Sequence, residues 1–169
     1  MNNFWRETLW SQFGAAIDTL ENAIRACPDE LWADRTRRAE FWYVVHHTLF
    51  WLDYYLSDST EGFKPPVPFG LEELDPAGVL PPRPYTKEDL LGYLEHGRTK
   101  CRKVIGDLTD ERGQQVYKFG SVDLTFAELL LYNLRHVQHH SAQLNFILRE
   151  TSNIGSRWVF RAKSDPGDA

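Results

Sequence analysis

Apolar residues recur at intervals of three and four along four long stretches of the chain, a spacing typical of amphipathic α-helices. The first stretch predicts a helix over residues 4–26. Its apolar positions are Trp5, Leu9, Phe13, Ala16, Leu20 and Ile24. Pro28 follows directly and ends the helix, because proline cannot continue one.

The second stretch, residues 38–57, reads RAEFWYVVHHTLFWLDYYLS and is apolar almost all round. Such a helix is expected to be buried on two sides. One side would face the core of a helical bundle and the other a partner subunit, so the pattern favours a homodimer.

Capping signals mark the starts of the last two helices. Thr86 and Asp89 stand at capping-box spacing before a helix predicted over residues 87–108. Thr125 and Glu128 match the same motif before a helix that runs to about residue 150, with Gly155 as its expected C-terminal stop. The segment RWVFRAK beyond it predicts an extended tail, residues 156–169, packed on the bundle.

The connection between the second and third helices is a proline-rich crossover over residues 58–85, far longer than a tight helix–helix turn. Extended, it spans up to about 90 Å, whereas a 20-residue helix is about 30 Å long. It can return along the bundle and start the third helix parallel to the second. We therefore predict an all-α fold: one domain over residues 1–169, a four-helix bundle with an up-down-down-up order.

Composition narrows the class of function. The formal net charge of -5 provides no positive field for a phosphate backbone, so we expect no nucleic-acid partner. Cys27 and Cys101 lack the spacing of a disulfide framework or a zinc ribbon. No stretch reaches the roughly 18 apolar residues of a membrane span, and no signal peptide opens the chain. These features predict a cytoplasmic protein with no membrane partner.

The segment YNLRHVQHHSAQL, residues 132–144, holds three of the six histidines. At about 100° per residue, His136 and His140 lie about 40° apart in the middle of an inward stripe, while His139 falls at its edge. An i, i+4 pair of imidazoles on a helix can bind one metal ion. His47 on the second helix is the better candidate for a third ligand, although His46 stays an alternative because that helix is apolar all round.

The alternative interpretation is that these histidines are ordinary hydrogen-bonded core residues and bind no metal. Two at i, i+4 and a third on another buried helix favour the metal. Neither helix carries the Glu-x-x-His motif of a di-iron bundle. The economical expectation is one divalent ion on three neutral imidazoles, with positions left open for water or substrate as in catalytic sites.

The chain resembles the DinB/YfiT family of metalloenzymes, four-helix bundles with a histidine triad. The resemblance runs from FWYVVHHTLFWLDYYL through the crossover to LLLYNLRHVQHHSAQL. It implies that His47, His136 and His140 are the metal ligands. His136, His139, His140 and Gln143 match the family's H-x-x-H-H-x-x-Q pattern on the last helix. The family's usual Arg-Gly in HHRGQ is Ser141-Ala142 here, which puts in doubt any role shared with that arginine.

The resemblance also implies a zinc or nickel ion, with iron or manganese as alternatives, and a low-molecular-weight thiol cosubstrate. We therefore expect a small-molecule substrate and a thiol-dependent S-transferase or isomerase; a non-catalytic metal-binding or ligand-sensing dimeric module is the alternative. Asn133, Tyr132, Gln143 and Tyr43 are candidates to orient the site, or to pack the core. His139 is either a base beside the metal or a surface histidine.

Overall fold

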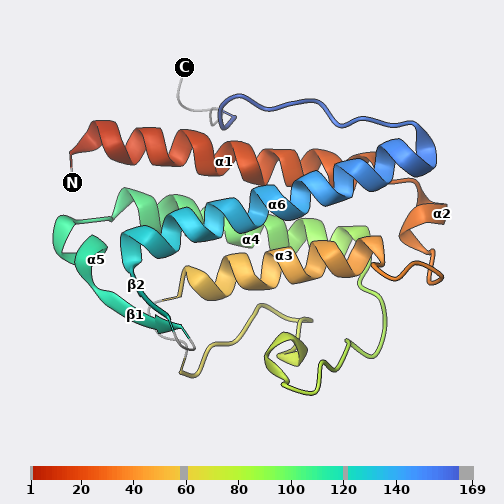
Figure 1. Cartoon of the computed structure of the whole chain (residues 1–169), viewed down its shortest axis with the longest axis horizontal. Coiled ribbons are helices and arrows are strands. Elements are labelled where there is room, and N and C mark those ends of the chain that lie inside the picture. Colours follow the sequence, from red (N-terminus) through yellow and green to blue (C-terminus); the bar gives the residue numbers. More distant parts are fainter. Residues whose placement is uncertain (1, 58–60, 120–121, 164–169) are drawn as a thin grey trace.

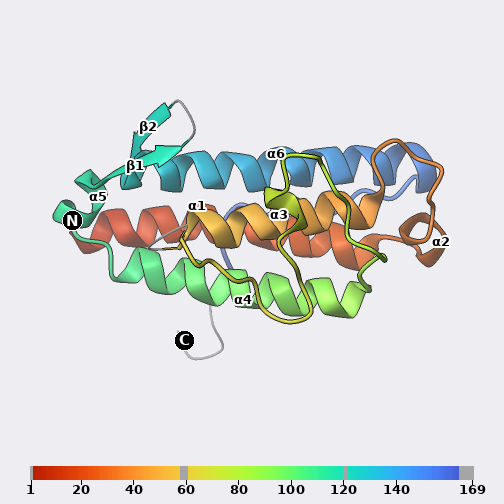
Figure 2. The same ribbon diagram turned by 90° about the horizontal axis from the view of Figure 1, so that it is seen from below.

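Four long helices lie side by side in the computed structural model, which describes residues 2–57, 61–119 (without the Phe119 side chain), 122 (backbone only) and 123–163 (Figure 1). They are α1 (Asn3–Ala26), α3 (Phe41–Tyr55), α4 (Lys87–Gly106) and α6 (Phe126–Ser152). Figures 1 and 2 show α1 and α6 running in one direction and α3 and α4 in the other. The predicted all-α bundle and its up-down-down-up order are confirmed. None of the described helices is both long enough and apolar enough to cross a membrane.

Short elements occupy the connections. They are α2 (Asp29–Trp32), the 3₁₀ turn η1 (Glu72–Leu74), α5 (Asp110–Gln114), β1 (Val116–Phe119) and β2 (Val122–Thr125). The two strands form an antiparallel hairpin with Val116 opposite Thr125. This hairpin was not expected from the sequence, because four-residue strands give too few positions for an alternating pattern to stand out.

The predicted helix starts at Thr86 and Thr125 are confirmed, and both capping boxes are complete. The second helix is shorter than predicted: it begins at Phe41 after an extended Glu40, so residues 38–40 lie outside it. Gly155 was the wrong C-terminal stop for the last helix. Asn153 ends it in the left-handed conformation, at φ 53°, which asparagine tolerates better than most residues.

The core forms where α1 and α3 each pack against both α4 and α6. Phe13, Leu20, Trp42 and Phe126 are among its fully buried large side chains. Gly97 permits a close approach of α4 to α3, because a Cβ atom there would lie 2.9 Å from a methyl carbon of Leu52. This tight packing holds α3 in place.

The crossover between α3 and α4 places η1 against the outer side of α3 (Figure 2). Residues 58–60 of the predicted crossover lie outside the described residues. The crossover also contains the cis peptide bond between Val67 and Pro68. Because η1 lies against α3, the crossover forms one wall of the candidate site as well as connecting two helices.

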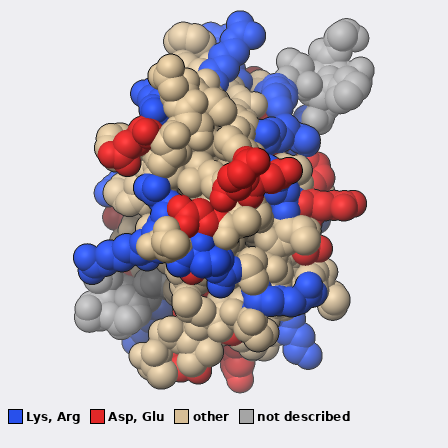
Figure 3. Space-filling view, turned by 90° about the vertical axis from the view of Figure 1, so that its right-hand side faces the viewer, with Lys and Arg blue, Asp and Glu red and all other residues tan. Residues whose placement is uncertain are grey.

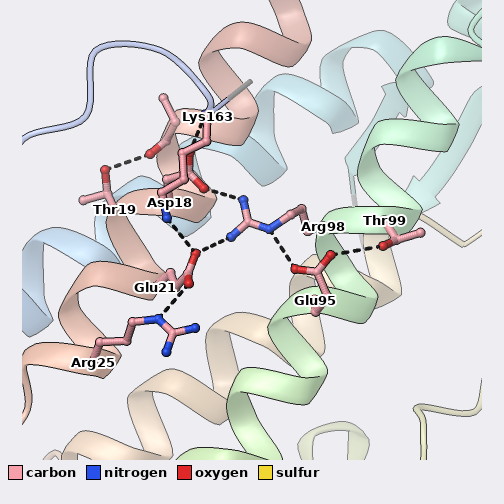
Figure 4. A network of polar contacts seen from close by, with 9 residues as sticks. Asp18, Thr19, Glu21, Arg25, Glu95, Arg98, Thr99 and Lys163 are labelled. Carbon is pink, nitrogen blue, oxygen red and sulfur yellow. Dashed lines mark hydrogen bonds and ion pairs between the residues drawn. The ribbon is translucent and has the colours of Figure 1, made fainter. Parts of the chain in front are cut away.

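A buried ionic cluster joins α1, α4 and the C-terminal tail (Figure 4). Arg98 of α4 pairs with Asp18, which is fully buried, and with Glu21 at 2.7 Å. The backbone N–H of Lys163 donates to Asp18 at 2.8 Å. The tail also contacts α1 where the backbone N–H of Ala162 donates to the backbone oxygen of Ser11 at 2.8 Å. The last residues of the predicted tail, 164–169, lie outside the described part of the chain.

Candidate metal centre

Helices α3 and α6 bring together the three histidines that the sequence analysis selected. One side-chain nitrogen from each of His47, His136 and His140 lies within 4.8 Å of the others. Nε2 of His47 and Nε2 of His136 lie 3.3 Å apart. Residues 89 positions apart in the chain therefore point ring nitrogens at one place.

The spacing of these nitrogens suits a single metal ion. Zinc–nitrogen bonds of about 2.0–2.1 Å at tetrahedral angles place two ligand nitrogens about 3.3–3.4 Å apart. The His47–His136 separation falls at that value. Imidazole nitrogens also suit nickel, copper and iron, so the donor set fits a divalent transition metal without selecting one.

Glu73 orients His47 from the opposite side. Nδ1–H of His47 donates to Oε2 of Glu73 at 2.7 Å, and the indole N–H of Trp51 donates to the same oxygen at 2.9 Å. This hydrogen bond assigns the proton to Nδ1 and leaves the Nε2 lone pair directed at His136. Carboxylate–histidine pairs of this kind fix metal-ligating imidazoles and raise their basicity.

Glu73 was not among the site residues expected from the sequence. It lies in η1, within the crossover, and its carboxylate is almost completely buried. No residue spacing links it to the histidines, which are 26 positions away at the nearest. The acidic run LEELD in an otherwise proline-rich and apolar crossover was the one signal available.

Gln143 orients the second α6 ligand. Nδ1–H of His140 donates to Oε1 of Gln143 at 2.8 Å, which leaves Nε2 of His140 free to bind an ion. The amide of Gln143 donates in turn to Nε2 of His139 at 3.0 Å. His139 is exposed and stands beside the cluster, linked to it through Gln143.

Burial favours the neutral forms of the two α6 ligands, His136 and His140. It lowers the pKa of His136 to about 3, helped by the neighbouring His140 and His47. Burial likewise lowers the pKa of His140. At Glu73 burial raises the pKa, but hydrogen bonds from His47, Tyr43 and Trp51 outweigh it and hold the pKa below its usual value. The site therefore presents two neutral imidazoles on α6 and a buried carboxylate beside His47.

His46 is fully buried and points away from the α6 histidines. Its ring lies 4.9 Å from that of Tyr85 and stacks at 5.8 Å on Phe69, measured between centroids. Burial lowers its pKa to about 4. Its nearest carboxylate is that of Glu73, at 3.9 Å, and Asp53 is instead near His96, at 3.4 Å.

The other sequence candidates divide between the site and the core. Tyr43 hydrogen-bonds Glu73, and burial with that carboxylate raises the pKa of the phenol. Asn133 is buried and donates to the backbone oxygen of Leu52, so it joins α6 to α3. Tyr132 is partly exposed and packs edge-on against Tyr55, with centroids 5.4 Å apart.

A family model described as the DinB superfamily matches residues 12–144, most of the chain from α1 through the histidine segment of α6. The chain belongs to the DinB superfamily. No curated protein and no solved structure matched it. The expected family is thus confirmed.

Ser141 and Ala142 are the two positions at which this DinB superfamily chain departs from the HHRGQ pattern. Ser141 is buried, and its hydroxyl donates to the backbone oxygen of Val137 at 2.7 Å. Ala142 lies on the outer side of α6, at the edge of a surface cleft. Neither side chain contributes to the convergence of the three histidines.

Proposed function

We propose that this protein is a divalent-metal-dependent enzyme in which His47, His136 and His140 hold one ion. The convergence of three imidazole nitrogens, two of them 3.3 Å apart, is the observation that carries the proposal. On the side away from the cluster, Nδ1–H of His47 donates to Glu73 and Nδ1–H of His140 donates to Gln143. Such a ligand set is already oriented before the ion binds.

Three protein ligands favour a catalytic over a structural ion, because structural zinc is held by four. The His47 side chain is 30% exposed, so a small molecule can approach the cluster from solvent. A divalent ion held there would supply Lewis acidity and lower the pKa of a bound thiol or water molecule. The chain's own part is to hold the ligand tautomers, through Glu73 and Gln143, and to keep His136 and His140 neutral by burial.

We propose thiol-dependent S-transfer or isomerisation as the reaction class, with a low-molecular-weight thiol as cosubstrate and zinc or nickel as the ion. Membership of the DinB superfamily and the open three-histidine geometry support this class. A homodimer in the cytoplasm belongs to the same proposal.

The test is elemental analysis of untagged protein, followed by metal titration and assay of the loaded form with a panel of thiols and electrophiles. We expect one ion per chain, lost in His136→Ala and His140→Ala, and a turnover that depends on the ion. If the protein binds a stoichiometric amount of metal but turns over none of the compounds in the panel, it is a non-catalytic metal-binding module. Absence of tight divalent binding would overturn the metal site itself.

A further inference from the structure

A cleft of about 760 Å³ opens beside the histidine cluster, between the segment that precedes α3 and the outer side of α6. Its size is in the range of small-molecule sites, roughly 300–1,000 Å³. His139 and Gln143 line it, and Gln143 is also the hydrogen-bond partner of His140. A molecule in this cleft would touch the residue that orients a candidate metal ligand.

The cleft carries a local excess of positive charge in an acidic chain. Arg37 and Arg38 line it, against the single carboxylate of Asp34. One oxygen of that carboxylate already accepts from the backbone N–H of Thr36 at 2.9 Å and from its hydroxyl at 2.6 Å. Figure 3 views the end of the bundle that carries this segment, where acidic and basic side chains mix around uncharged surface.

The two arginines are largely available to a ligand. Arg37 lies 3.8 Å from the exposed carboxylate of Glu150, a loose contact that is worth little in water. Within the described ranges, no carboxylate lies within ion-pair distance of Arg38. Two guanidinium groups in neighbouring positions form a site for a carboxylate or a similar anion.

The remaining wall is apolar. Val44, Ile147 and Ala142 line it, together with Phe146, whose side chain is 64% exposed. An exposed aromatic ring in a concave site is the kind of surface that an apolar ligand body covers. Ala142 leaves room above α6 that a larger residue would fill.

We propose that this cleft binds the body of the substrate, a small organic anion whose carboxylate meets Arg37 and Arg38 and whose apolar part lies on Phe146. Gln143 and His139 face its other end, toward the three histidines. The proposal rests on the proposed function for the reactive end of the substrate, and on the cleft alone for the anionic end.

Binding of two matched probes to metal-free protein tests the cleft. The probes are 4-phenylbutyrate and its neutral amide, measured by calorimetry in the presence of a chelator. Because charge-assisted hydrogen bonds to a carboxylate are strong, we expect about tenfold or more preference for the acid. The double variant Arg37→Gln/Arg38→Gln should lose that preference. Ala142→Trp should weaken the binding of both probes, because the larger side chain fills part of the cleft.

Arg35→Gln is the matched control. It removes one positive charge from the same segment, but Arg35 pairs with Glu40 at 2.7 Å and does not line the cleft. It should keep the preference for the acid. Equal binding of acid and amide to the wild type, or a preference that survives Arg37→Gln/Arg38→Gln, would overturn the proposal.

Zinc titration of the same proteins separates this inference from the metal site. Arg37→Gln/Arg38→Gln should bind zinc as the wild type does, while His140→Ala should lose zinc and keep the preference for the acid. If the wild type prefers the acid but binds no zinc, the anion site stands and the proposed metal function is wrong. If it binds zinc but shows no preference for the acid, the anion site alone is wrong.

Discussion

Two buried polar clusters lie on different pairs of helices and differ in how their charges are balanced. The cluster between α1 and α4 contains its own counter-charges, because Arg98 meets the carboxylates of Asp18 and Glu21. The cluster between α3 and α6 consists of three imidazoles and the buried carboxylate of Glu73, which accepts a hydrogen bond from His47. The first needs nothing from outside the chain, whereas the second is a set of lone pairs that a cation would complete.

The difference separates folding from function. A buried ion pair is sensitive to the loss of either partner, because the remaining charge is left in a poorly solvated place. His136 and His140 are held neutral and carry no such charge, so the bundle can fold around them and bind the ion afterwards. Loss of a residue should therefore reduce stability in the first cluster and metal affinity in the second.

The largest effect is expected from Arg98→Ala. It leaves the fully buried Asp18 without its main counter-charge, which should cost about 3–5 kcal/mol in the free energy of unfolding. Urea denaturation followed by circular dichroism measures it. Arg25→Ala is the control, since that exposed arginine pairs with the same Glu21 and should cost no more than about 1 kcal/mol. Equal losses in the two variants would contradict the view that the α1–α4 cluster acts through buried charge.

The next effect is the stabilisation of the wild type by zinc. At a free zinc concentration 100 times the dissociation constant, the free energy of unfolding should rise by about 2.7 kcal/mol. His136→Ala should abolish this increment, and Arg98→Ala should keep it if the variant folds. Urea titrations with zinc and with a chelator measure both. His96→Ala is the control, because His96 lies on α4 beside Asp53 and away from the cluster. An increment that persists in His136→Ala would place the binding elsewhere.

The sequence allowed the helices and the histidine convergence to be predicted for a shared physical reason: both depend on the helical repeat. His136 and His140 share a face because they are one turn apart, and the capping motifs at Thr86 and Thr125 are local. The bundle order followed from the length of the crossover. These features need only neighbouring residues or chain length.

Glu73 and the surface cleft could not be predicted in that way. Glu73 reaches His47 because an irregular crossover folds back along α3, a path that no periodicity specifies. The cleft depends on residues 38–40 leaving the helix, whereas the apolar pattern extended the helix through them. The choice between His46 and His47 also needed the structure, since α3 is apolar on all sides and only its neighbours decide which ring faces α6.

Glu73→Gln should lower zinc affinity by about 10–100-fold, the usual effect of removing a carboxylate that orients a ligand. The amide keeps the size of the side chain but can present a donor instead of an acceptor to Nδ1 of His47. Competition with a chromophoric chelator measures the dissociation constant. Glu72→Gln makes the same change one residue earlier in η1 and should leave the affinity unchanged. If the two variants behaved alike, Glu73 would have no special part in holding His47.

Gln143→Ala should have the smallest effect, because its contact with His140 is a neutral hydrogen bond at an exposed position. Such a bond contributes about 0.5–1.5 kcal/mol, so zinc affinity should fall roughly 2–10-fold. Gln138→Ala is the control, because Gln138 lies on the same helix and lines a second surface cleft together with His139. This variant should not change the zinc affinity. The ranking of Glu73 above Gln143 follows from burial: the Glu73 carboxylate is 5% exposed and charged, whereas water can replace the amide of Gln143. A larger loss in Gln143→Ala than in Glu73→Gln would mean that His140, rather than His47, limits how well the three nitrogens hold the ion.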